Sequence, residues 1–222
     1  MPWAGGLGCL GHPRTGMQAA ESSMIFPEGR AEQGGNQRNV VWPCVVIGMT
    51  GSVSVALMPQ ALLVLRQVAG EVHVLMSRAA TRFATTCAVQ LYSGQPVRID
   101  DEEADCESPL IHIELIGRAN VFLIMPATAN MLAKAAHGIC DDVISTAIIA
   151  ARGPIVFVPS MNEAMWKNPA IEDAVSLLRT RGHRVIEPTW GREISNLSPN
   201  FGVMPGIEAV IAELASLRFE SR

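Results

Sequence analysis

From Val40 onward, short and nearly continuous apolar runs alternate with stretches in which apolar residues recur every three or four positions. The runs predict strands covered on both faces, and the amphipathic stretches predict the helices between them. The predicted strands are Val41–Ile47, Glu71–Met76, Val121–Met125, Ile155–Val158 and Arg184–Ile186. The predicted helices are 52–69, 79–92, 129–150, 169–181 and Pro205–Leu217, with a kink or late start at Pro59. This alternation predicts βαβ units and an α/β fold with a doubly wound parallel sheet.

Residues 1–38 follow a different pattern, because they hold many glycines and show no sustained period of two or 3.6 residues. We therefore expect a flexible N-terminal tail over 1–38 and a single domain over 39–222. Met24 offers a second possible start of the chain.

Composition narrows the class of protein. The chain has 222 residues, of which 49% are hydrophobic and 17% charged, as expected for one folded domain. A net charge of −4, without a basic run interleaved with aromatics, argues against nucleic acid as a partner. No apolar run approaches the length of a membrane span, and the N-terminus lacks a signal-peptide pattern. We expect a soluble, cytoplasmic protein with no membrane partner.

The five cysteines form no CxxC pair, and no histidine stands at metal-ligand spacing from them. This pattern predicts a reducing compartment and no metal site. The cysteines are Cys9, Cys44, Cys87, Cys106 and Cys140.

Candidate chemistry lies in the loops after the predicted strands, because open parallel sheets bind ligands at the carboxyl ends of their strands. Gly48–Ser54 offers small and hydroxyl-bearing residues at a helix start, which favours a phosphate. The same residues are also typical of a tight turn with Ser52 as N-cap. Ser77–Arg82 could reach the same anion, or it could be a helix cap with solvated arginines.

The loop after the third strand, Pro126–Asn130, combines a strand-ending proline, small residues that admit a planar ligand, and an amide. The Asn130 amide can donate to a carboxylate. The alternative is a strand-to-helix turn capped by Thr128 or Asn130.

The loop after the fourth strand, Pro159–Trp166, contains two methionines, an asparagine and a tryptophan. Large apolar side chains are rarely left in water, so this loop predicts a ligand pocket, a subunit contact or a loop folded back on its own core. His112 either ends an extended segment or lies in a helix capped by Ser108, and its role is structural or catalytic.

In this order, the loops resemble the flavoprotein family of cysteine decarboxylases. Its members include phosphopantothenoylcysteine decarboxylases and the peptidyl-cysteine decarboxylases of lanthipeptide, linaridin and thioamitide biosynthesis. Pro126–Asn130 is similar to the family's Pro-Ala-Ser-Ala-Asn-Thr motif, with Thr128 for Ser and Met131 for the final Thr. Pro159–Trp166 is similar to Pro-Ala-Met-Asn-x-x-Met-Trp, with Ser160 for Ala.

The resemblance covers about 43–190 and includes two further segments. His112 in His-Ile-Glu-Leu matches the segment of the active-site histidine, and Gly138–Asp142 matches the helix after the asparagine loop. The resemblance implies a single-domain, flavodoxin-like (Rossmann-type) fold that binds FMN, with FAD as the alternative, at a subunit interface. It also implies a homo-oligomer, either a trimer or a dodecamer.

The resemblance further assigns roles to residues. His112 would be the catalytic base and Asn130 would hold the substrate carboxylate, while Ser52 and Ser77 would contact the flavin phosphate. The expected cofactor-binding residues are Gly48, Thr50, Gly51, Ser52, Ser77, Thr81, Pro126, Ala127 and Thr128. The expected substrate-binding residues are Asn130, Met161, Asn162, Met165 and Trp166.

The two branches of the family differ in a cysteine. The phosphopantothenoylcysteine branch carries one in the segment after the Met-Trp loop, where it reduces the enethiol. Gly191–Pro205 has none, and no cysteine follows Cys140. This favours oxidative decarboxylation of the C-terminal cysteine of a precursor peptide to an aminoenethiol. The alternatives are phosphopantothenoylcysteine decarboxylase of coenzyme A biosynthesis and a non-catalytic flavin-binding regulatory protein. A flavin prenyltransferase shares the fold but would not be expected to carry both His-Ile-Glu-Leu and Met-Asn-x-x-Met-Trp.

Overall fold

The computed structural model describes residues 39–99, 111–192 and 197–217, and for Ile111 and His112 it describes the backbone alone. The tail predicted over 1–38 lies outside the described residues.

The centre of the domain is a six-stranded sheet in the order β3-β2-β1-β4-β5-β6, in which every neighbouring pair is parallel. If the short edge strand β3 is left aside, this is the strand order of flavodoxin-like sheets. The α/β prediction and all five predicted strands are confirmed. The strands are β1 (Trp42–Met49), β2 (Ala69–Met76), β3 (Val97–Ile99), β4 (Val121–Ala127), β5 (Ile155–Pro159) and β6 (Arg184–Val185).

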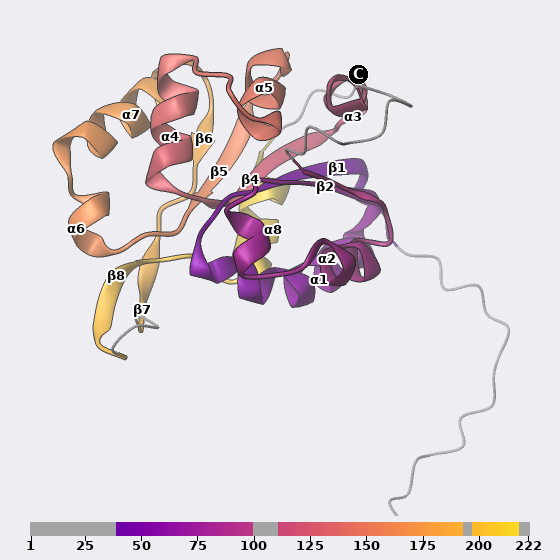
Figure 1. Ribbon diagram of the computed structural model, residues 1–222, viewed down its shortest axis with the longest axis horizontal. Helices are drawn as coiled ribbons and strands as arrows, with labels where there is room; N and C mark the ends of the chain where they lie inside the picture. The colour runs from indigo at the N-terminus through magenta and orange to yellow at the C-terminus, as the bar shows by residue number, and fades with distance from the viewer. Residues whose placement is uncertain (1–38, 100–110, 193–196, 218–222) are drawn as a thin grey trace, which may run out of the picture. The chain divides into compact units, whose positions relative to one another are not determined.

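Helices cover both faces of the sheet (Figure 1). One face packs on α1 (Met58–Val68), α2 (Thr86–Ser93) and α8 (Ile207–Ser216). The other packs on α3 (Ile111–Arg118), α4 (Ala129–His137), α5 (Val143–Ala150) and α7 (Pro169–Thr180). Successive residues of β1 alternate between the two cores, since Val45 lies in one and Val46 in the other. Burial on both faces explains the continuous apolar runs of the sequence.

The helix predicted over 52–69 has the late start expected from Pro59. A 3-10 turn, η1 (Val53–Leu57), comes first, and α1 begins at Met58 with the proline in its first turn. There the missing N–H of proline costs no hydrogen bond.

Two predicted helices are wrong as continuous elements. The stretch 129–150 divides into α4 and α5, because Gly138 adopts a left-handed conformation with φ of 70° and ends α4. Asp142 then starts α5 by accepting a hydrogen bond of 2.7 Å from the Ser145 N–H. The stretch 79–92 divides into η2 (Ala80–Arg82) and α2, where Thr85 is the N-cap.

The pattern also missed short elements. These are β3, the four-residue helix α6 (Glu163–Trp166), and an antiparallel hairpin of β7 (Thr189–Arg192) and β8 (Pro199–Val203). None has a long apolar run, so periodicity could not reveal them. No helix in the described part of the chain has the length and apolarity to cross a membrane.

The junction between α4 and α5 allows a stability prediction. Burial opposes ionisation of Asp142, yet hydrogen bonds from Lys134 and Ser145 lower the pKa of its carboxyl below the usual value. Asp142→Ala should therefore destabilise the protein by about 1–2 kcal/mol, because it removes a helix cap and one partner of Lys134. Urea unfolding at neutral pH measures this loss.

The sign of the pH dependence follows from the same pKa. A carboxyl with a lowered folded-state pKa stabilises the protein above its unfolded pKa, and that contribution disappears as the pH falls through the folded value. The difference between wild type and Asp142→Ala should therefore shrink in acid. Asp173→Ala, on the exposed face of α7, is the control and should show neither effect. An equal loss of stability at acid and neutral pH would contradict this account.

Candidate active site

The loops after β1 and β4 are joined at the carboxyl edge of the sheet by Thr50. This is where the strand order reverses, the usual place for a ligand crevice. The buried Thr50 hydroxyl donates to the Pro126 carbonyl oxygen at 2.7 Å and accepts from the Thr128 N–H at 2.9 Å. Its hydrogen bonds are thus made within the protein, so Thr50 shapes the two loops by joining them.

Three serine hydroxyls connect the loops after β1 and β5. The Ser160 Oγ lies 2.9 Å from the Ser52 Oγ and 2.7 Å from the Ser54 Oγ. Ser54 and Ser160 are buried, whereas Ser52 is partly exposed and caps η1. The arrangement places a partly exposed serine and the first turn of η1 at the carboxyl edge of the sheet.

The loop after β2 lies directly against the loop after β1. A Cβ on Gly51 would come within 2.4 Å of the Ala79 Cβ, so only glycine permits this approach. The Ser77 N–H donates to the Met49 carbonyl at 3.0 Å, which fixes the second loop beside the first. The Thr81 hydroxyl, in contrast, donates to the Arg78 carbonyl within its own turn.

Gly48 has a packing role. A Cβ there would lie 2.8 Å from the Ile124 side chain and 2.9 Å from that of Ile144, so the missing side chain makes room for the core. Pro126 and Ala127 are buried at the end of β4, and the Ala127 carbonyl accepts from the Ser160 N–H at 3.0 Å. These residues hold the loops of β1, β4 and β5 together.

At the start of α4, Thr128 caps the helix and Asn130 exposes its amide. Thr128 is the N-cap and accepts from the Met131 N–H at 3.3 Å. Asn130 is exposed on the first turn, where its amide faces outward near the positive end of the helix dipole. Met131 is buried in the core, so a methionine in place of the family's threonine fills apolar space.

In the loop after β5, some apolar side chains are exposed and others pack against the core. Asn162 caps α6 by accepting from the Met165 N–H at 2.9 Å, and Met165 is exposed. Met161 and Trp166 pack against the core on the α7 side, and Trp166 also lines a cavity of about 380 Å³ with Val175 and Arg179 of α7. Trp166 is therefore directed toward α7, which the sequence pattern did not indicate.

The β7–β8 hairpin docks on this loop through Gly202. The Met161 N–H donates to the Gly202 carbonyl at 3.1 Å, and a Cβ on Gly202, whose φ is +118°, would lie 2.2 Å from the Met161 carbonyl. Trp190 and Phe201 pair edge to face at 5.7 Å on the hairpin, and Trp190 is 68% exposed. An exposed tryptophan paired with a partly buried phenylalanine beside the Met161 loop is a surface suited to a ligand.

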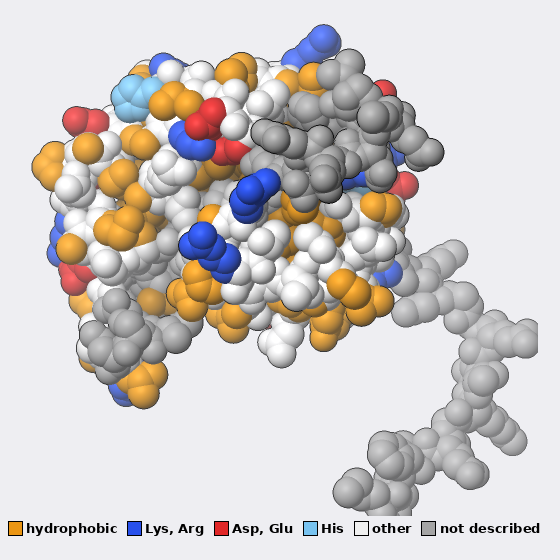
Figure 2. Space-filling model, in the orientation of Figure 1, with side chains coloured by type: hydrophobic (Ala, Val, Ile, Leu, Met, Phe, Trp, Pro, Cys, Tyr) orange, Lys and Arg blue, Asp and Glu red, His pale blue; other side chains and the backbone are white. Residues whose placement is uncertain are grey.

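Basic side chains add positive charge to the loop after β2 and to η2. Arg78 and Arg82, in and after the loop of β2, are both exposed. Figure 2 shows Lys and Arg side chains near the middle of the face in view. Cations beside hydroxyls and a helix start favour an anionic ligand group.

His112 belongs to α3, so this residue is helical, whereas the expected cap, Ser108, lies outside the described residues. Its side chain lies outside the described residues. Sequence reasoning missed Ser54, Ser160 and Gly202, because the contacts that give them a role join separate loops. The substitution of Ser160 for the family's alanine was the one available signal.

The flavoprotein family profile matches residues 34–218. Among curated proteins, the coenzyme A biosynthesis bifunctional protein CoaBC of Mycobacterium tuberculosis is 33% identical over 177 residues, which cover 79% of this chain and 41% of that protein. The chain thus spans about two fifths of the length of this relative.

The match to two solved structures of the same fold extends over nearly the whole length of each of those proteins. The FMN-dependent cysteine decarboxylase SpaF is 33% identical with a TM-score of 0.66, over 77% of this chain and 94% of SpaF. The peptidyl-cysteine decarboxylase EpiD is 28% identical with a TM-score of 0.69, over 79% of this chain and 99% of EpiD.

Proposed function

The chain belongs to the flavoprotein family, and from that premise we propose that it binds FMN and oxidatively decarboxylates a cysteine at the C-terminus of a peptide. The observation that carries the proposal is the meeting of two kinds of loop at one edge of the sheet. Hydroxyl-bearing loops after β1 and β2 suit a phosphate, and the start of α4 presents the amide of Asn130. SpaF and EpiD, by their names, are cysteine decarboxylases.

The residues at this edge fit a flavin mononucleotide. Ser52 and Ser77 offer hydroxyls for the phosphate, and Gly51 brings their two loops into contact. The exposed Arg78 and Arg82 add positive charge for an anion. Thr50, Pro126 and other residues with internal contacts serve by holding the loops in place.

We further propose that the protein works as a homo-oligomer with the site at a subunit interface. Val53 and Leu57 are exposed apolar residues on η1, directly after the hydroxyl-bearing loop, and Phe83 is exposed after η2. Apolar surface beside a polar site is typical of an interaction surface. The resemblance to the family implies a trimer or a dodecamer, and size-exclusion chromatography distinguishes them.

The reaction divides between the cofactor and the chain. When bound, FMN supplies a two-electron acceptor for the oxidation of the substrate cysteine at its Cβ–S unit. His112 accepts the proton of the thiol as this carbon is oxidised to a thioaldehyde, a task that suits an imidazole because one of its ring nitrogens offers a lone pair in the neutral form.

Asn130 orients the substrate carboxylate. An amide donates to the carboxylate without stabilising its charge as strongly as arginine would, so the carboxylate keeps its tendency to leave. The carboxyl group then departs as CO2, and its bonding electrons delocalise into the C=S bond. An enethiol results, and the peptide has lost CO2 and two hydrogens.

Two observations bear on the substrate. The hairpin docked on the Met161 loop contains no cysteine in Gly191–Pro205, which supports the peptide branch because the other branch uses one as reductant. The similarity to CoaBC proteins favours phosphopantothenoylcysteine as the second candidate substrate.

A direct comparison of substrates tests the proposal. The purified protein should be yellow, release FMN on denaturation, and decarboxylate a peptide ending in Cys faster than phosphopantothenoylcysteine. The same peptide with a C-terminal Ser is the control and should not react. A preference for phosphopantothenoylcysteine would transfer the assignment to the second candidate, and a protein that gains no flavin on incubation with FMN would refute both.

Docking of the hairpin on the Met161 loop gives a further prediction. Gly202→Ala places a methyl group against the Met161 carbonyl and should lower kcat/KM for the peptide by on the order of a hundredfold, because the loop is displaced. FMN content should remain unchanged. Gly182→Ala is the matched control: φ is +86° there, but a Cβ meets nothing within 4 Å. Equal effects of the two changes would show that backbone strain alone, and not docking, explains the loss.

A further inference from the structure

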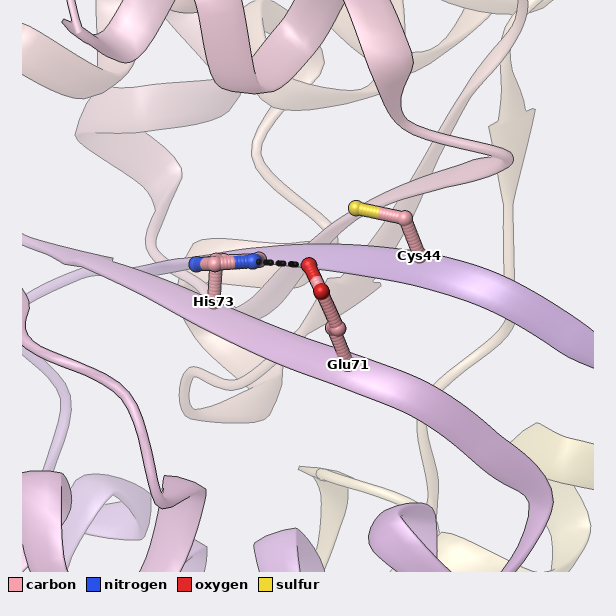
Figure 3. A group of neighbouring side chains, drawn as sticks. All are labelled: Cys44, Glu71 and His73. Atoms are coloured by element: carbon pink, nitrogen blue, oxygen red, sulfur yellow. Dashed lines mark hydrogen bonds and ion pairs between the residues drawn. The ribbon is translucent and has the colours of Figure 1, made fainter.

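A second group of reactive side chains lies at the opposite end of β1 and β2 from the candidate active site. Cys44 and Glu71 are register partners on the two parallel strands, and His73 follows two residues later on the same face. Figure 3 shows the three side chains on one side of the sheet. The candidate active site begins only after Met49 and Met76, where these strands end.

The potential donor atoms of this group are close together. One sulfur, one carboxylate oxygen and one imidazole nitrogen all lie within 4.8 Å of one another. Cys44 and His73 are 6% and 7% exposed, while the Glu71 side chain is 45% exposed. Two ligands are thus held by the core, and the third lies at the surface.

The Nε2 atom of His73 has two neighbours with which it cannot form hydrogen bonds at the same time. Its Nε2 lies 2.9 Å from the Glu71 Oε2, an acceptor, and 2.9 Å from the Arg118 guanidinium, a donor. One ring nitrogen either carries a proton or offers a lone pair, so it satisfies only one of these neighbours. A cation bound to the lone pair would satisfy His73 and Glu71 together.

We propose that Cys44, Glu71 and His73 bind a zinc ion, with water in the fourth position. Zinc takes thiolate, imidazole and carboxylate ligands at roughly 2.0–2.3 Å, so donors that all lie within 4.8 Å of one another need shift by only about an ångström to surround the ion. A cavity of about 370 Å³ lined by His73, Arg98, Glu114 and Arg118 gives the ion and the water a route of entry.

Arg118 is the cation that a metal ion must displace from His73. Its side chain is 54% exposed, so it can turn toward solvent with little loss of packing. The Arg118 guanidinium also lies 3.1 Å from the Glu71 Oε2. Charge balance favours the exchange, since a thiolate and a carboxylate neutralise the divalent ion.

Cobalt and zinc binding to the FMN-loaded protein test the proposal. After removal of metals with a chelator, the protein should take up one zinc ion per chain, measured by elemental analysis after dialysis. Bound cobalt should give the d–d absorption bands of a tetrahedral site in the red part of the spectrum, at longer wavelengths than the flavin absorbs. It should also give a thiolate-to-cobalt charge-transfer band. Cys44→Ser and His73→Gln should each weaken zinc binding by roughly a hundredfold or more, since even outer-shell changes cost up to about that much.

Matched controls use the exposed cysteines. Cys87→Ser and Cys140→Ser should leave uptake and the cobalt spectrum unchanged, because these thiols lie apart from the group. If Cys44→Ser does not fold, Glu71→Gln, at a half-exposed position, provides the same test. Zinc uptake that is absent in the wild type, or that survives Cys44→Ser and disappears with the exposed cysteines, would overturn the proposal.

Discussion

Replacing His112 with asparagine should abolish turnover of a Cys-terminal peptide while leaving FMN bound. Asparagine keeps hydrogen-bonding capacity but cannot accept the thiol proton, and loss of a general base costs about 10²–10⁴-fold in rate. The residue lies in α3, outside the hydroxyl-bearing loops that we assign to the cofactor, so flavin content should not fall. Single-turnover rates and the flavin-to-protein ratio measure the two effects.

Asn130→Asp should fail for a different reason. A carboxylate there repels the carboxylate of the substrate and should raise KM as well as lower kcat. The same change should not harm the fold, because an acidic side chain in the first turn of α4 favours the helix dipole. Loss of activity with unchanged or higher stability is therefore the specific expectation.

Two controls match these changes in chemistry. His137→Asn alters an exposed histidine at the other end of α4, and Asn168→Asp alters the N-cap of α7, where aspartate caps equally well. Both variants should turn over at the wild-type rate. If His112→Asn or Asn130→Asp did so too, the role assigned to that residue would be wrong.

Much of the fold was predictable, because strands buried on both faces appear in the sequence as continuous apolar runs. β1, β4 and β5 are almost wholly buried, and their apolar runs could form little else than strands of a covered parallel sheet. The division at Gly138 was not predicted, because the apolar period continues across it. The break is marked by Gly138, the left-handed C-cap of α4, and by Asp142, the N-cap of α5.

The candidate site was predictable as a set of loops but not as a set of contacts. Helix starts and hydroxyls identified the loops around Ser52 and Asn130. The Ser54–Ser160 hydrogen bond and the Cys44–Glu71 pair depend on which strands are neighbours and in what register, and one sequence does not reveal that. The spacing of Glu71 and His73 does indicate a shared face, because residues two apart on a strand point to the same side of the sheet.

The second prediction with a large expected effect concerns the two electrons that the flavin takes from the substrate. Under anaerobic conditions, one equivalent of a peptide ending in Cys should bleach the visible absorption of the bound flavin and leave it bleached. The hairpin that docks on the Met161 loop offers no cysteine to return electrons to the product, since no cysteine follows Cys140. The peptide should then be found to have lost CO2 and two hydrogens.

Air provides the matched control. Oxygen removes two electrons from the reduced cofactor, so admitting it should restore the yellow colour and permit further turnovers of the same sample. Without oxygen, product should stop at one equivalent per bound flavin, whereas a protein that reduces its own enethiol would continue. The mass of the product reports the same difference independently, because a saturated thiol has lost CO2 alone. Anaerobic multiple turnover to that saturated product would establish a reductive step in this chain, and phosphopantothenoylcysteine would then be the better candidate substrate.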